Sequence, residues 1–185
     1  MISDIHIVSM RDIIIDDIYQ RMMTEKNLFF LSSDFGSPRL DRIRKDFRDR
    51  FFNIGIAEQN TVNISLGLAL EGNSVIVYGI APFITMRAFE QLRVNLAIHS
   101  QLKNIDVTIL GVGAGLSYDV SGPTHHCLED ISIINSLPFF SIYSPSDSLC
   151  ALQLFKSSRK IKNQNISGLM ENYCPYFLKK LINTI

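Results

Sequence analysis

One glutamate carries the clearest chemical signal in this sequence. Glu58 lies in the first turn of residues 57–71, whose apolar spacing predicts a helix that is buried on most sides. Such a carboxylate could simply be stabilised there by the helix dipole. Burial also disfavours the charged form of a carboxyl group, and a partly protonated carboxyl group can share a proton with a bound molecule. Glu58 is therefore a candidate for acid–base chemistry.

Two adjacent histidines are the second candidate. His125 and His126 stand between Thr124 and Cys127. Because the side chains of consecutive residues diverge, this run is not expected to bind one metal ion. A histidine is often only structural, but one in a glycine-flanked loop suits proton transfer or the recognition of hydroxyl groups. We predict such a role for His125 and predict no metal site.

Three alternating glycines suggest a dinucleotide-binding loop but do not fit one. That fingerprint is Gly-x-Gly-x-x-Gly at the start of a helix, whereas here the third glycine comes one residue too early and a polar loop follows. The sequence also lacks the Gly-x-x-x-x-Gly-Lys-Ser/Thr motif of nucleotide-binding P-loops. We expect Gly111, Gly113 and Gly115 to let the backbone pass close to another group.

The elements that must position these residues follow from alternating apolar segments. Strands are predicted at residues 28–31, 51–52, 74–78, 107–110 and 139–143, and helices at residues 12–25, 57–71, 85–98, 128–136 and 147–155. Strands that alternate with helices imply crossover connections, so we predict an α/β fold with a mostly parallel sheet and helices on both faces. Ligands bind beyond the carboxyl ends of such strands.

Two of these helices carry further predictions. In the helix at residues 85–98, the spacing places Met86, Phe89, Leu92 and Leu96 on the inward face. The last predicted helix is expected to begin behind a capping serine, Ser146.

The composition favours a single ordered domain. The chain has 185 residues, 46% of them hydrophobic, and its 18 Lys and Arg balance its 18 Asp and Glu. The charge is uneven, because residues 151–185 hold six Lys or Arg against one Glu, which leaves −5 on residues 1–150. Since the pattern of helices and strands fails beyond Lys156, we predict a domain at residues 1–155 and a basic, solvated tail at residues 156–185.

Several classes of protein are not indicated. The balanced charge points to neither a nucleic-acid partner nor a membrane partner. No segment approaches the ~18 apolar residues of a membrane span, and the start of the chain does not resemble a secretory signal. Three widely spaced cysteines, Cys127, Cys150 and Cys174, suggest neither a disulfide framework nor a zinc site. We therefore expect the chain in the reducing cytoplasm.

Five segments together resemble the pyrimidine-binding domain of the transketolase family, whose members use thiamine diphosphate. They are FNIGIAEQN at residues 52–60, GLALEG at residues 67–72, APFITMRAFEQ at residues 81–91, GPTH at residues 122–125, and LP followed by SPSD within residues 137–147. They occur in the family's order and at its spacing. The resemblance implies a transketolase-like transferase subunit with the pyrimidine-domain fold, which moves a two-carbon ketol unit between sugars.

The resemblance also implies residues that bind the cofactor. Glu58 matches the glutamate that hydrogen-bonds N1′ of the aminopyrimidine and so activates the cofactor. Phe83 matches an aromatic residue of the pyrimidine pocket, with Ile84 as a competing candidate for that place. Phe89 matches a second aromatic residue, although it could equally be a packing residue. Asp34 resembles an acidic residue near the cofactor.

Three further residues are implied to contact the substrate. His125 matches a histidine that contacts substrate hydroxyl groups and helps to move protons. Arg11 resembles an arginine that can contact a substrate phosphate. Ser121 stands where the family usually has an aspartate that recognises a sugar hydroxyl group, and Asp119 could substitute for it. This departure puts the usual sugar-phosphate specificity in question.

The half of the site that binds diphosphate is not found in this sequence. In the family it carries a Gly-Asp-Gly motif and an asparagine for Mg²⁺, and this chain has no Gly-Asp-Gly. No arginine follows Arg159, so the phosphate-binding arginine of the domain's last strand is not matched either. The resemblance therefore implies that the diphosphate of thiamine diphosphate and Mg²⁺ are bound mainly by a partner subunit. It also implies a homodimer of this domain within a heterotetramer that acts on a sugar or sugar phosphate.

Other functions stay open. A 1-deoxyxylulose-5-phosphate-synthase-like enzyme or a 2-oxo-acid dehydrogenase β-type subunit would use the same cofactor, although the GPTH loop favours transketolase. A different alternative is a truncated, non-catalytic remnant that acts as a binding module. The unmatched residues after Gln164 favour the remnant, and the intact segment around Glu58 argues against it.

Overall fold

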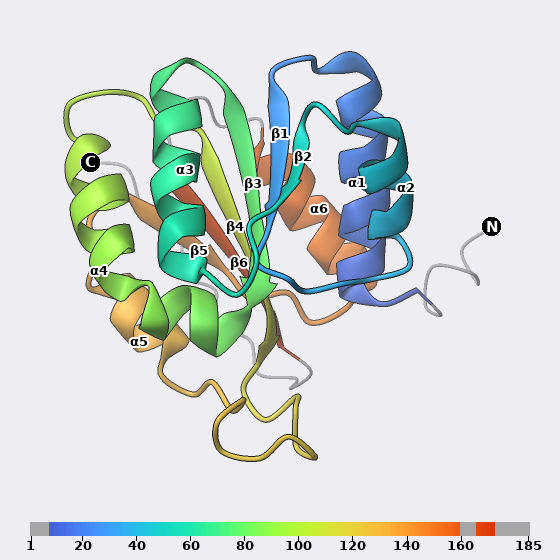
Figure 1. The fold of residues 1–185 in the computed structure, drawn as a ribbon. Helices are drawn as coiled ribbons and strands as arrows, with labels where there is room; N and C mark the ends of the chain where they lie inside the picture. Colours follow the sequence, from blue (N-terminus) through green and yellow to red (C-terminus); the bar gives the residue numbers. More distant parts are fainter. Residues whose placement is uncertain (1–7, 160–165, 173–185) are drawn as a thin grey trace.

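The computed structural model describes residues 8–159 and 166–172, which form one α/β unit (Figure 1). Its centre is a six-stranded sheet in the order β2-β1-β3-β4-β6-β5, and every neighbouring pair of these strands is parallel. The strands are β1 (Leu28–Ser32), β2 (Phe51–Asn53), β3 (Ser74–Ile80), β4 (Val107–Ala114), β5 (Phe140–Tyr143) and β6 (Ile166–Asn172). The predicted parallel sheet is confirmed.

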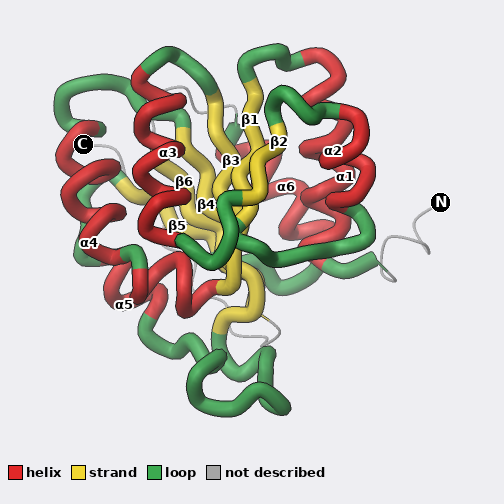
Figure 2. The backbone as a smooth tube through the Cα atoms, in the orientation of Figure 1, coloured by secondary structure: helices red, strands yellow, loops and turns green. Residues whose placement is uncertain are grey.

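Helices cover both faces of the sheet, as predicted (Figure 2). One face carries α3 (Glu58–Leu70), η2 (Phe83–Arg87), α4 (Phe89–Gln91), η3 (Leu92–Ile98) and α5 (Asp130–Asn135). The other carries α1 (Met10–Thr24), α2 (Leu40–Asp46) and α6 (Ser148–Ser158). Side chains alternate along β1, so that Leu31 joins the core under α3 and Phe30 joins the core under α1.

The chain changes direction across the sheet between β1 and β3. After β1 it moves outward to the edge strand β2, then crosses back through α3 to β3 on the other side of β1. Open parallel sheets bind ligands in the crevice at such a switch point, outside the carboxyl ends of the strands. Here a hydrogen bond of 3.0 Å between Ser33 Oγ and Thr61 Oγ1 joins the end of β1 to the first turn of α3. Glu58 therefore begins its helix at this switch point.

The end of the fold differs from the prediction. Helix α6 continues to Ser158, and its capping residue is Asp147, whose Oδ1 accepts a hydrogen bond of 2.8 Å from Cys150 N, not Ser146. Beyond it, β6 pairs with both β4 and β5, although the sequence pattern places residues 156–185 in a solvated tail. The pattern failed there because the polar residues 156–165 hide a short strand behind them. The remainder of the predicted tail lies outside the described residues.

The helical segment after β3 is less regular than the predicted helix at residues 85–98. Helices η2 and η3 have wide, π-helical turns on either side of the short α4. The wider turns shift the buried face, so that Ile84 and Leu92 are buried while Met86 is 37% exposed. Met86 was therefore wrongly assigned to the inward face. Wide turns of this kind occur often at functional sites.

Helix α3 is also less enclosed than its composition predicts. Its buried residues are Glu58, Thr61, Val62, Ser65, Leu66 and Ala69, whereas Gln59, Asn60, Asn63 and Gly67 are exposed. A Cβ atom added to Gly67 would meet nothing within 4 Å. The helix therefore leaves one uncharged face uncovered in the single chain.

Strand β4 includes the glycines that were expected to follow it. Gly113 has a φ of +78°, which favours glycine, and a Cβ atom there would lie 1.9 Å from Cε2 of Tyr118. The expectation that these glycines allow a close approach is confirmed at Gly113, and the group that approaches is the Tyr118 ring. This contact anchors the loop at residues 116–126, which protrudes beyond the carboxyl edge of the sheet (Figure 1).

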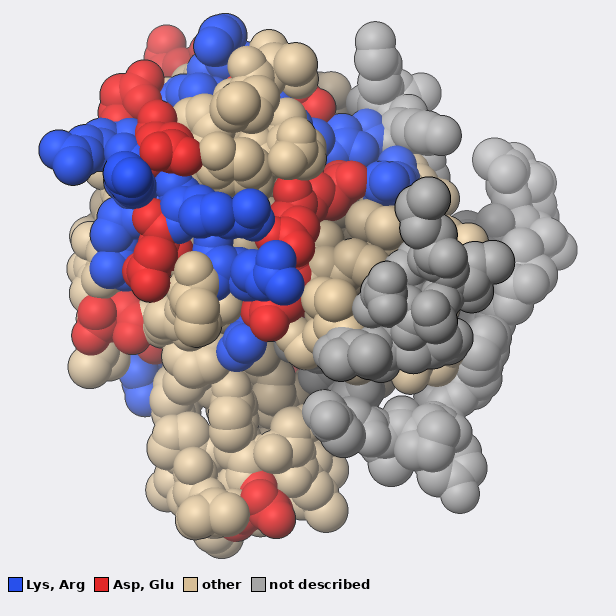
Figure 3. All heavy atoms as spheres, turned by 90° about the vertical axis from the view of Figure 1, so that its right-hand side faces the viewer, with Lys and Arg blue, Asp and Glu red and all other residues tan. Residues whose placement is uncertain are grey.

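Charge is distributed unevenly over the surface (Figure 3). Basic and acidic side chains crowd over α1 and α2, where Arg39 and Arg42 both pair with Asp16. The protruding loop is almost free of charge, with Asp119 as its one ionised side chain. Within the described ranges, no helix is long and apolar enough to cross a membrane.

Candidate active site

Glu58 is buried and paired with an arginine. The residue is 2% exposed, and its Oε2 accepts a hydrogen bond of 2.9 Å from Arg87 Nη1. Arg87 is the last residue of η2, and its side chain is 42% exposed. The carboxylate therefore faces the carboxyl edge of the sheet through a single, partly exposed cation.

Two aromatic rings extend this pair into a cluster. The Cζ atom of Arg87 lies 4.2 Å from the centre of the Phe83 ring, which is a cation–π contact. The Phe83 ring in turn meets the His125 ring edge-on, with 5.2 Å between the ring centres. Glu58, Phe83 and His125, all predicted as site residues, are thus linked through Arg87. Ile84 is fully buried in the core, so the exposed aromatic position belongs to Phe83.

The loop that carries His125 is held at both ends. Gly115 and Cys127 exchange backbone hydrogen bonds of 2.7 and 2.8 Å, which close the loop at its base. Farther out, the Tyr118 ring lies edge-on to the His125 ring, with 6.1 Å between their centres. The Nδ1 atom of His125 lies 3.0 Å from Thr124 Oγ1. These contacts direct the histidine toward Phe83.

Asp34 lies at the end of β1, in a loop that borders the switch point. Its φ is +50°, a left-handed conformation that aspartate tolerates better than most residues. Its backbone N–H donates to Asn53 Oδ1 at 3.1 Å, and its own Oδ1 accepts from Asn53 Nδ2 at 3.0 Å. Asn53 also accepts from the backbone N–H of Gly55. Asp34 is therefore fixed beside the turn that leads into Glu58, and its cofactor role stays a prediction.

The other predicted site residues lie outside the linked cluster. Ser121 is exposed in the protruding loop, where its N–H donates to Tyr118 O. Phe89 packs against the core under α3. Arg11 lies in the first turn of α1, on the opposite face of the sheet, and pairs with Asp12 at 2.9 Å. Their predicted roles are not tested by these contacts.

Two buried titratable groups lie beneath the histidine loop. Burial raises the pKa of the Cys127 thiol to about 12, and the nearby Asp130 carboxylate adds to this shift. Burial likewise raises the pKa of Asp130, whose Oδ2 has no hydrogen-bond partner among the described residues. Thr85 Oγ1 lies 3.9 Å from Cys127 Sγ and bonds Ala81 O. Cys127 is thus a poor nucleophile, and this group supports the loop from below.

The sequence analysis missed Arg87. The residue stands inside the segment APFITMRAFEQ but received no role there. A usable signal was present, because Arg87 follows Phe83 by four residues, a spacing that brings side chains together on a helix. In the part of the chain that the structure describes, no group of His, Cys, Asp and Glu could hold a metal ion.

Comparison with known proteins identifies the family. The family model described as "Transketolase, pyrimidine binding domain" matches residues 7–173. One of the two subunits of an apulose-4-phosphate transketolase from Phocaeicola vulgatus is 34% identical over 152 residues, which are 82% of this chain and 47% of that protein. The putative transketolase C-terminal section of Methanocaldococcus jannaschii is 35% identical over 66% of this chain and 38% of its own length. This chain thus spans about half, or less, of these relatives.

Solved structures share the fold. A protein described as "Split gene transketolase, inactive beta4 tetramer" superimposes with a TM-score of 0.74 at 24% identity, over 88% of this chain and 50% of that one. The transketolase of Campylobacter jejuni gives a TM-score of 0.75 at 16% identity, over 88% of this chain and 25% of its own. With the matched family model and the cluster around Glu58, these likenesses show that the chain belongs to the transketolase family as its pyrimidine-binding domain.

Proposed function

We propose that this chain is the pyrimidine-binding subunit of a two-chain, thiamine-diphosphate-dependent enzyme that transfers a two-carbon ketol unit between sugars. One observation carries the proposal. Glu58 is buried at the head of α3, at the carboxyl edge of the sheet, and is linked through Arg87 to Phe83 and His125. We also place this enzyme in the cytoplasm.

The residues of the cluster fit the aminopyrimidine half of the cofactor. The Arg87 guanidinium is a planar cation that donates an N–H to Glu58 while it lies against the Phe83 ring. An aminopyrimidine protonated at N1′ is also planar, cationic and an N–H donor. A site that holds the first group therefore has the acceptor and the aromatic surface that the second requires.

Each residue then has a defined task. Glu58 would hold the proton at N1′ of the pyrimidine, and burial would keep water away from that hydrogen bond. Phe83 would pack against the ring, which is worth about 0.5–1.5 kcal/mol beyond the buried area. His125 would bind a substrate hydroxyl group and move a proton from it. The cofactor itself supplies the electron sink for breaking the bond between two carbons.

The remaining predicted residues have peripheral roles in this proposal. Asp34 and Phe89 would border the cofactor, and Ser121 and Arg11 would contact the sugar or its phosphate. The diphosphate and Mg²⁺ would be bound mainly by a partner subunit, in a heterotetramer that contains two copies of each chain. The uncovered face of α3 supports the expected contact between two copies of this domain.

A paired substitution tests the catalytic assignment. The two-chain enzyme isolated with tagged parent chain should transfer a two-carbon unit from a ketose phosphate to an aldose, and Glu58→Gln should lower kcat by at least about a hundredfold. Glu71→Gln is the matched control, because Glu71 follows the other end of α3 and is exposed. Full activity of Glu58→Gln would refute the role of Glu58. Release of CO₂ from a 2-oxo acid would instead assign the synthase-like or dehydrogenase-like alternative.

A further inference from the structure

We propose that Arg87 occupies the place of the cofactor's aminopyrimidine in the unliganded chain, and that the cofactor must displace it to reach Glu58. The inference rests on the function proposed above. It adds a residue of this chain that competes with the cofactor and so sets how readily the site accepts it.

The contacts of Arg87 are those that the proposed ligand needs. Its Nη1 donates to Glu58 Oε2 at 2.9 Å, which uses the acceptor proposed for the pyrimidine. Its Cζ atom lies 4.2 Å from the centre of the Phe83 ring, which uses the proposed stacking surface. One guanidinium therefore covers both recognition elements at once, and a pyrimidine ring could not make the same contacts beside it.

Arg87 is held loosely enough to be exchanged. Its side chain is 42% exposed, and within the described part of the chain its hydrogen bond to Glu58 is the one ion pair that it makes. Farther along the same helical segment, Arg93 contrasts with it, since Arg93 is held by both carboxylate oxygens of Glu90. A displaced Arg87 would extend into water, where a guanidinium is well solvated, at the cost of one partly exposed ion pair.

Competition of this kind lowers the apparent affinity of the empty chain. The observed dissociation constant equals the intrinsic one divided by the fraction of molecules with an open site. A partly exposed ion pair keeps that fraction at about one fifth, so the chain should bind the pyrimidine about fivefold more weakly than an open site would. The diphosphate contacts of the partner subunit would then be needed to drive Arg87 out. The chain alone would hold its glutamate neutralised.

The test is an NMR titration of the full chain with 4-amino-5-hydroxymethyl-2-methylpyrimidine, which is the pyrimidine half of the cofactor without the diphosphate. Arg87→Met keeps the length of the side chain but removes the competing cation, and it should bind this compound about fivefold more tightly than the parent. In the parent, the guanidinium resonances of Arg87 should move toward those of a solvated arginine as the compound binds.

Two controls separate this inference from the proposed function. Arg93→Met removes an ion pair that does not involve Glu58, and it should leave the affinity unchanged. Glu58→Ala should weaken binding by at least about tenfold, since a hydrogen bond to a charged group is lost. If Glu58→Ala binds as well as the parent, the proposed function fails together with this inference.

The inference alone is overturned by two results. One is that Glu58→Ala weakens binding while Arg87→Met binds as the parent does, or more weakly, which would make Arg87 a supporting residue instead of a competitor. The other is that neither the parent nor Arg87→Met binds the compound at any attainable concentration. A parent that shows no binding beside an Arg87→Met chain that binds would support the inference.

Discussion

Two arginines on the two sides of this molecule make the same kinds of contact with opposite consequences. Arg50 donates to Glu25 O at 2.8 Å and to Met22 O at 3.0 Å, and its Cζ atom lies 5.0 Å from the centre of the Phe47 ring. Arg87 likewise combines one hydrogen-bond acceptor with one aromatic ring. Arg50 is 7% exposed, whereas the Arg87 side chain is 42% exposed.

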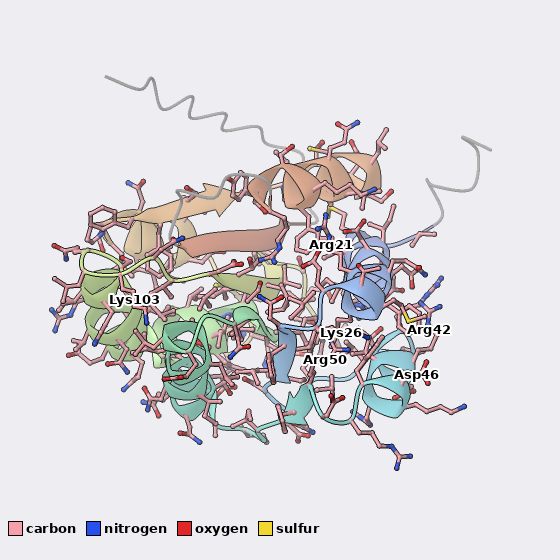
Figure 4. All side chains as sticks on the ribbon, turned by 90° about the horizontal axis from the view of Figure 1, so that it is seen from above. Arg21, Lys26, Arg42, Asp46, Arg50 and Lys103 are labelled. Atoms are coloured by element: carbon pink, nitrogen blue, oxygen red, sulfur yellow. The ribbon has the colours of Figure 1, made fainter. Side chains whose placement is uncertain are left out.

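The difference lies in the acceptors. Arg50, between β1 and α2 (Figure 4), satisfies backbone carbonyl groups at the end of α1, which lie beyond the last intrahelical donors and cannot move without unwinding the helix. Arg87 satisfies a side-chain carboxylate that another donor could reach. A buried arginine on backbone carbonyls thus fixes the fold, and a half-exposed arginine on a carboxylate marks a place that a ligand can take.

The largest expected effect is on Arg50. Arg50→Met should lower the free energy of unfolding by about 3 kcal/mol, because buried carbonyl groups lose a charged donor. Urea unfolding of the isolated chain measures this loss. Arg48→Met is the matched control, since Arg48 is exposed and should change stability by less than about 0.5 kcal/mol. Equal stability of the two variants would remove the distinction drawn for Arg50.

A glycine pair should give the next largest effect. Gly113→Ala should cost about 2 kcal/mol, because the new Cβ atom would strike the Tyr118 ring and the backbone has a positive φ. The signals of His125 should shift in an NMR spectrum as Tyr118 leaves its place. Gly67→Ala, where space is open in a helix, should instead gain about 1 kcal/mol. A tolerated alanine at residue 113 would show that Tyr118 does not anchor the loop.

Removal of Arg87 should cost less than either loss described above. Arg87→Met should lower the free energy of unfolding by about 1 kcal/mol or less, because the ion pair is partly exposed and Glu58 can gain water or a proton when it is lost. The same urea titrations measure it. A loss as large as that of Arg50→Met would place Arg87 among the fixed structural residues.

The smallest effect is expected at Asp130. Burial raises its pKa in the folded chain, so its contribution to stability is full below the unfolded pKa and is lost as pH rises through the folded pKa. Asp130→Asn removes the unpartnered charge and should equal or exceed the parent in stability at neutral pH, by up to about 1 kcal/mol. This advantage should shrink on acidification, which urea titrations at several pH values would measure. An advantage that grows in acid would contradict the direction of the shift.

Much of the fold could be predicted from sequence because its strands are continuous apolar runs between polar loops. Strand β6 could not, since its pairing depends on β4 and β5, which are distant in sequence. The inward face at residues 85–98 was misplaced at Met86 because an ideal helical period does not describe wide turns. Glu58 and His125 were found by residue type and resemblance, but Arg87 becomes a site residue only when the fold brings η2 beside α3.

Native mass spectrometry of this chain, purified from its source cells with thiamine diphosphate and Mg²⁺ present, tests the central claim most directly. We predict an assembly that contains a second polypeptide in equal copies, together with bound cofactor. A chain that is recovered alone and without cofactor would contradict the two-chain enzyme and would favour a non-catalytic binding module.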